Sequence, residues 1–141
     1  MNFYVLVAPI SLVLQILILF LLLGSIWFKA AKKFRQHGLT MLTAVVLHTT
    51  TIVAVMIPSF GGISSGHFST VISALAILHG TLGALAEILG VWVVASWRLR
   101  DSQEHCISKR RVMRLTLVTW IIAIILGVLI YLNFYTSVLK L

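Results

Sequence analysis

Acidic residues are almost missing from this sequence, and charged residues of either sign are few. Only 3 of the 141 residues are Asp or Glu, and charged residues make up 10% of the chain against 60% that are hydrophobic. An ordinary soluble domain carries about 25% charged residues. This composition therefore excludes a soluble globular fold and is typical of a protein embedded in a membrane.

Cysteine is nearly absent as well. Cys106 is the only one, so neither a disulfide within the chain nor a metal site made of several thiolates is possible. The sequence also lacks a phosphate-binding glycine loop, an HExxH motif and a nucleophile spaced suitably from a base. We therefore expect no hydrolytic chemistry and no independent catalysis.

Four apolar stretches are long enough to cross a bilayer, which takes about 20 residues in a helix. They cover residues 3–28, 39–57, 68–97 and 112–139. The short connections between them favour antiparallel neighbours. The sequence thus predicts one all-α transmembrane domain over residues 1–141, an antiparallel four-helix bundle in contact with the lipid bilayer.

The formal charge of +8 is concentrated in two connections. The clusters are Lys29, Lys32, Lys33 and Arg35, and Arg98, Arg100, Lys109, Arg110, Arg111 and Arg114. The connection over residues 58–66 has neither Lys nor Arg. By the positive-inside rule, both basic connections are expected to be cytoplasmic and both termini outside a cell membrane. This placement does not favour a nucleic-acid partner.

Two histidines are predicted near the middle of the membrane, His48 in the second stretch and His79 in the third. If these helices are neighbours, the imidazoles face each other at similar depth. Ionisable residues inside a membrane usually have a function, and imidazole is the commonest metal-ligating side chain. The pair is therefore predicted to supply both axial ligands of a haem b. Small residues near His79, Gly83 among them, would leave space for the haem.

Two other interpretations of this pair remain open. The histidines can be hydrogen-bonded members of the helix interfaces, with the small residues serving close helix packing. Alternatively they bind copper with help from Met41 or Met56, whose thioethers favour copper(I).

A second haem is predicted from His37 and His105. His37 and His48 are eleven residues apart, which on a helix is three turns plus about 20°, so both face the same way. His105 is expected at the same membrane surface as His37. Because His105 stands in a charged loop, a merely solvated histidine is the alternative.

Glu87 is the acidic residue inside the third stretch. It lies eight residues from His79, which is about 80° around the helix and about 12 Å along it. It is therefore not a simple partner of His79. Its possible roles are a hydrogen bond to a ligand histidine, binding of a quinone hydroxyl, a proton relay, or a bond to a neighbouring helix.

Three segments resemble a family of small bacterial and archaeal membrane proteins, known as domain of unknown function four-twenty and linked to maturation of haem-copper terminal oxidases. The segments are RQHGLTMLTAVVLH, LHGTLGALAEILGVWVVASWRLR and HCISKRRVMRLTLVTWIIAIILGVLIYL. The resemblance covers Arg35 to Leu132. It implies that His37, His48, His79 and His105 belong together and act near haem or a respiratory oxidase.

The sequence as a whole predicts a cytochrome b-like membrane protein. It would carry electrons within or beside a respiratory complex, with a quinone, an oxidase or another membrane redox subunit as partner. The first alternative is a cofactor-assembly factor for a haem-copper terminal oxidase. The second is a proton pathway that uses Glu87 without any cofactor.

Overall fold

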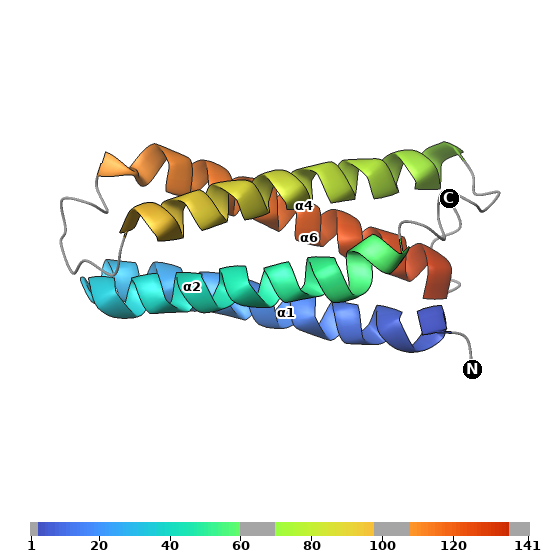
Figure 1. Ribbon diagram of the computed structural model, residues 1–141, viewed down its shortest axis with the longest axis horizontal. Coiled ribbons are helices and arrows are strands. Elements are labelled where there is room, and N and C mark those ends of the chain that lie inside the picture. Colours follow the sequence, from blue (N-terminus) through green and yellow to red (C-terminus); the bar gives the residue numbers. More distant parts are fainter. Residues whose placement is uncertain (1–2, 60–69, 98–107, 136–141) are drawn as a thin grey trace.

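The computed structural model describes residues 3–59, 70–97 and 108–135. Its long helices are α1 (Phe3–Ala30), α2 (Phe34–Thr51), α4 (Thr70–Trp97) and α6 (Arg110–Tyr135). Figure 1 shows them side by side, each running opposite to the one before it in the chain. The expected all-α antiparallel four-helix bundle is confirmed, with four helices long and apolar enough to cross a membrane.

The second helix begins five residues earlier than the predicted start at residue 39. The turn before it ends α1 through a left-handed residue, Lys32, with φ 58°. The Lys33 N–H donates to the Phe28 carbonyl at 2.9 Å, and the Lys32 N–H to the Lys29 carbonyl at 3.1 Å. This pair of bonds closes the helix end without glycine. His37 consequently lies in the first turn of α2, two residues before the predicted start of the span.

A π-helix, η1 (Ile52–Met56), follows α2 directly and was not expected. The three threonines before it, residues 49–51, each donate a side-chain hydrogen bond to the carbonyl four residues earlier. Such bonds bend a helix, and π-helical turns are frequent at functional sites. The other predicted ends agree within two residues where they can be compared. Residues 68–69 and 136–139 lie outside the described ranges.

The bundle is built from two close pairs, α1 on α2 and α4 on α6, which α2 joins by packing on α4. Its core contains Ile18, Leu22, Val45, Trp120 and Ile124. Trp120 is completely enclosed. Because all four helices converge on this core, side chains from any of them can meet in the interior.

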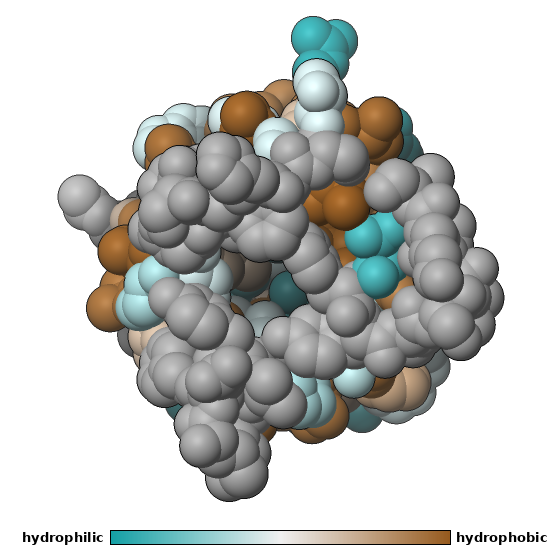
Figure 2. Space-filling model, turned by 90° about the vertical axis from the view of Figure 1, so that its right-hand side faces the viewer, coloured by the Kyte–Doolittle hydropathy of each residue, from teal (hydrophilic) through white to brown (hydrophobic). Residues whose placement is uncertain are grey.

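The molecule has apolar side chains outside and many polar ones inside. Large hydrophobic residues such as Phe20, 67% exposed, and Ile88, 66% exposed, face outward. The buried polar side chains are Gln15, Ser25, His37, His48, Thr51, Thr116 and Thr119. In the end view of Figure 2, brown apolar side chains are visible at the periphery. This distribution suits contact with lipid.

Candidate functional site

His48 lies on the inner face of α2, with 4% of its surface exposed. Its Nδ1 atom is 2.7 Å from Oε2 of Glu87 on α4. The hydroxyl of Thr49 contacts the other carboxyl oxygen, Oε1 of Glu87, and shares its one hydrogen between that oxygen and the Val45 carbonyl. The only acidic side chain within the described residues is therefore held by two neighbouring residues of α2.

This geometry matches one of the roles left open for Glu87, a hydrogen bond to a candidate ligand histidine. The histidine is His48, which the spacing along α4 could not indicate because His48 belongs to another helix. Identifying it requires the rotation of α2 against α4. That rotation is a property of the assembled bundle.

His79 is half-buried and is turned toward α6. Its Nδ1 atom lies 2.8 Å from the backbone carbonyl oxygen of Ala123. Beside it, a Cβ added to Gly127 would lie 2.9 Å from Cε1 of His79 and 2.6 Å from Oε1 of Gln15. Gly127 therefore allows two polar side chains to approach α6 closely. Neither Gly127 nor Gln15 was among the residues predicted for the site.

The two central histidines use the same ring nitrogen in the same way. A carbonyl oxygen can only accept, so Nδ1 of His79 carries the hydrogen of that bond. In a neutral imidazole, Nε2 then has the free lone pair. The bond between His48 Nδ1 and the Glu87 carboxyl permits the same arrangement. Histidines that bind metals through Nε2 commonly donate from Nδ1 to a carboxylate or a backbone carbonyl.

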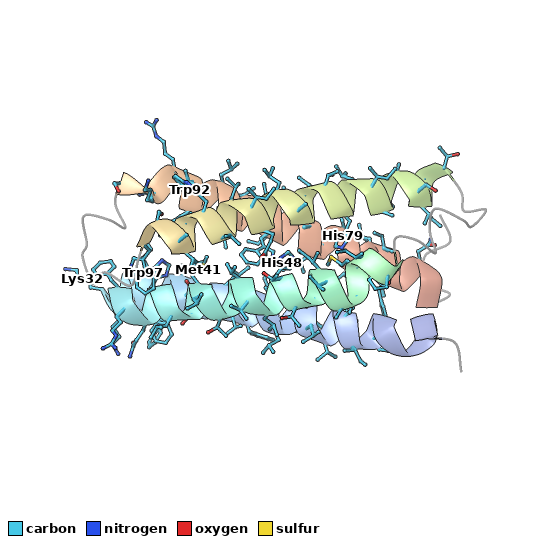
Figure 3. All side chains as sticks on the ribbon, in the orientation of Figure 1. Lys32, Met41, His48, His79, Trp92 and Trp97 are labelled. Atoms are coloured by element: carbon cyan, nitrogen blue, oxygen red, sulfur yellow. The ribbon has the colours of Figure 1, made fainter. Side chains whose placement is uncertain are left out.

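His48 contacts Glu87, which lies eight residues from His79 on α4, or about 12 Å along the helix axis. The similar depth expected for the two imidazoles is therefore not found. Open space lies beside Gly83, between the levels of the two histidines. Gly83 is buried, yet a Cβ added there would have no atom within 4 Å. It is four residues from His79 and four from Glu87, which is about 6 Å along α4 in each direction. Figure 3 shows both histidines in the bundle interior, with His79 nearer to the end at which α1 begins.

Trp120 of α6 covers His48 from another side. The ring centroids are 4.9 Å apart, and the ring planes are inclined by 60°. A Cβ added to Gly90 would lie 3.5 Å from the same indole and 3.1 Å from Val45. The sequence could indicate Trp120 only as a residue of the membrane boundary or of a cavity. In the structure it is the largest fully buried side chain of the described residues, and its ring packs against His48.

His37 lies three turns from His48 on α2, near the first basic connection. Its Nδ1 atom is 2.9 Å from the backbone carbonyl oxygen of Ser25 and 2.7 Å from the Ser25 hydroxyl. Its Nε2 atom is buried without a hydrogen-bond partner. His105, the other member of the predicted second pair, lies outside the described residues, so that pair stays a prediction.

Within residues 3–59, 70–97 and 108–135, no group of three or more His, Cys, Asp or Glu side chains is placed to hold a metal ion. A site here must therefore use two histidines, or histidine with other ligand types. Protein-family models, curated proteins and solved structures contain no match to this chain. The resemblance to the four-twenty family accordingly stays a prediction.

Proposed function

We propose that this chain is a haem-binding membrane protein in which His48 and His79 are the axial ligands of one haem b. In this proposal it carries electrons within or beside a respiratory complex. The observation that carries the proposal is the shared hydrogen-bonding pattern of the two imidazoles. Each is bonded through Nδ1 to an oxygen of a neighbouring helix, which leaves Nε2 for the iron.

The space beside Gly83 supports the same proposal. A planar macrocycle needs a part of the helix surface that no side chain occupies. Gly83 provides such a part, because a Cβ added there would have no atom within 4 Å. The position is between His79 and Glu87 along α4. Apolar surroundings suit a macrocycle, and the core around Trp120 and Val45 supplies them.

The protein's own residues would hold the ligands in place. Glu87 and the Ala123 carbonyl fix the rotation of the two rings, and Thr49 holds the second oxygen of Glu87. Bound haem would supply a one-electron couple, whose potential responds to its axial ligands and to burial. A carboxyl bonded to one ligand ring and not to the other makes the two ligands inequivalent.

A quinone or an oxidase subunit is the proposed redox partner, and the lipid bilayer surrounds the bundle. The exposed apolar side chains of the helices support the bilayer contact. The proposed orientation has both basic connections in the cytoplasm and both termini outside, because all Lys and Arg residues except Lys140 belong to the two basic clusters.

The test is a dithionite-reduced minus oxidised absorption spectrum of the purified protein. We expect a sharp low-spin haem band that is lost in His48→Ala and in His79→Ala and retained in Met56→Leu. A further variant, His79→Met, should keep a low-spin band and raise the reduction potential, because a thioether replaces one imidazole. That variant separates loss of a ligand from loss of the fold.

A band that persists in both alanine variants would reject His48 and His79 as ligands. Absence of haem from the folded wild-type protein would favour the proton pathway instead. The observation behind that second candidate is the contact of Glu87 with His48 and Thr49 in the bundle interior. Proton flux into cofactor-free vesicles that Glu87→Gln abolishes would support it.

A further inference from the structure

A small cavity lies at the end of the bundle where α1 passes into α2. It measures about 20 Å³, which suffices for one water-sized occupant. His37, Gly38 and Met41 of α2 line it, together with Trp97 of α4 and Met113 of α6. Figure 3 shows Met41 and Trp97 at this end, away from His48 and His79. The cavity is therefore separate from the proposed haem site.

One residue that lines the cavity, His37, has a buried ring nitrogen without a hydrogen-bond partner. His37 is 8% exposed, and its Nδ1 is held by Ser25 of α1 at 2.7 and 2.9 Å. Because a carbonyl oxygen accepts one of these bonds, Nδ1 carries the hydrogen and Nε2 has the lone pair. That lone pair has no partner, and a buried polar atom without a hydrogen bond is destabilising. A ligand that accepts this electron pair would remove the destabilisation.

Two thioethers line the same cavity. Met41 is four residues after His37, so both side chains lie on one face of α2, and Met113 reaches the cavity from α6. Thioether sulfur is a soft ligand that selects copper(I), whereas imidazole binds copper in either oxidation state. One imidazole and two thioethers from two helices make a ligand set for a soft monovalent ion.

The charge of the ligand set also favours a monovalent ion. His37, Met41 and Met113 are neutral ligands, so nothing in the set compensates a second positive charge. The cost of taking an ion out of water rises with the square of its charge, which penalises zinc(II) or copper(II) in an apolar cavity. Copper(I) avoids most of that penalty.

Trp97 closes the cavity against Gly38. A Cβ added to Gly38 would lie 2.2 Å from two atoms of the Trp97 ring, so the indole rests directly on the backbone of α2. Any side chain at residue 38 would displace it. The arrangement brings an aromatic ring to a cavity that also holds the histidine and the two thioethers.

We propose that Nε2 of His37 and the sulfur atoms of Met41 and Met113 form a copper(I) site, closed by Trp97. The site is independent of the proposed haem ligands. It uses His37 in a different way from the predicted pair with His105.

The test is equilibrium dialysis of the purified full chain against copper(I), kept reduced by ascorbate and buffered by the chelator bicinchoninate, with bound copper measured by elemental analysis. We expect Met41→Leu and Met113→Leu each to weaken binding by about tenfold or more, since even loss of a residue behind a ligand costs that much. Leucine keeps the volume of methionine, so both variants should fold. Met56→Leu, a methionine of η1 outside the cavity, is the matched control.

X-ray absorption of the copper-loaded protein should detect sulfur neighbours that are lost in the double variant of Met41 and Met113. Wild-type affinity in both single variants, or an equal loss in Met56→Leu, would overturn the proposal. So would loss of a haem band in His37→Phe, because His37 would then be a haem ligand. The haem spectrum of Met41→Leu should be unchanged, which keeps the two proposals separately testable.

Discussion

His48 and His37 lie on the same face of α2, about 16 Å apart, yet the bundle surrounds them differently. His48 bonds to a carboxyl of α4 and packs against the indole of Trp120. His37 bonds to a serine of the adjacent helix α1, and its other nitrogen is unpartnered. In both cases Nδ1 is occupied. The surroundings of Nε2 therefore decide what each histidine can bind.

The difference shows how one helix can present two kinds of site. At the level of His48, the interior contains a carboxyl, and open space lies about one turn of α4 away, beside Gly83. At the level of His37, it contains a small cavity with two thioethers. Histidine occurs twice on the same face of α2, eleven residues apart. The partner differs, because Glu87 of α4 contacts His48 and Ser25 of α1 contacts His37. Single substitutions near His48 or near His37 can test whether the two sites are independent.

Trp120→Ala should produce the largest effect. Trp120 is fully enclosed, and truncating such a residue costs about 3–5 kcal/mol. We expect the free energy of unfolding to fall by about 3 kcal/mol, at the lower limit of that range. Lipid is as apolar as the protein core, so the cost comes from the cavity that the substitution leaves and not from transfer of the side chain. The measurement is the free energy of unfolding in detergent.

Trp120→Phe, which keeps most of the ring, is the control for Trp120→Ala and should lose much less. The copper(I) affinity of Trp120→Ala should stay at the wild-type value where the protein is folded, because Trp120 does not line the cavity. A parallel loss of copper binding would mean that the two levels of the bundle are not independent.

The fold was predictable because mean hydropathy along the chain suffices to find four spans and their order. The start of α2 at Phe34 was not predictable from hydropathy, because the basic and glycine-containing segment before residue 39 resembles a loop. Whether it is helical depends on Lys32 adopting a left-handed backbone conformation. The η1 segment depends similarly on threonine side chains that bond to the backbone, a choice that composition does not determine.

The sequence was sufficient to select the candidate residues, but not to predict which side chains they contact. The histidines and Glu87 stand out because ionisable residues are rare in membranes. The bond from His48 to Glu87 depends on how α2 is rotated against α4, and the cavity at His37 needs Met113 from a distant helix. Such contacts arise only when the helices assemble.

Glu87→Ala should have the second largest effect. It removes the carboxyl that contacts Nδ1 of His48 and leaves this buried ring nitrogen without a partner, which costs about 1–3 kcal/mol. Thr49 is exposed and keeps its hydrogen bond to the Val45 carbonyl. We expect a loss of about 2 kcal/mol in the free energy of unfolding. Glu87→Gln keeps the shape and one acceptor oxygen, so its loss should be about 0.6 kcal/mol, the average for hydrogen bonds between membrane helices. A loss of about 3–5 kcal/mol in Glu87→Gln would instead indicate a broken ion pair.

Ser25→Ala should have the smallest effect, and it tests how His37 is oriented. The substitution removes the hydroxyl that lies 2.7 Å from Nδ1 but leaves the backbone carbonyl at 2.9 Å. We expect a loss of about 1 kcal/mol or less in the free energy of unfolding, the usual value of one hydrogen bond. Since the carbonyl still holds the ring, copper(I) affinity should fall far less than in Met41→Leu. An equal fall in both variants would show that the hydroxyl, and not the backbone of α1, fixes the orientation of the His37 ring.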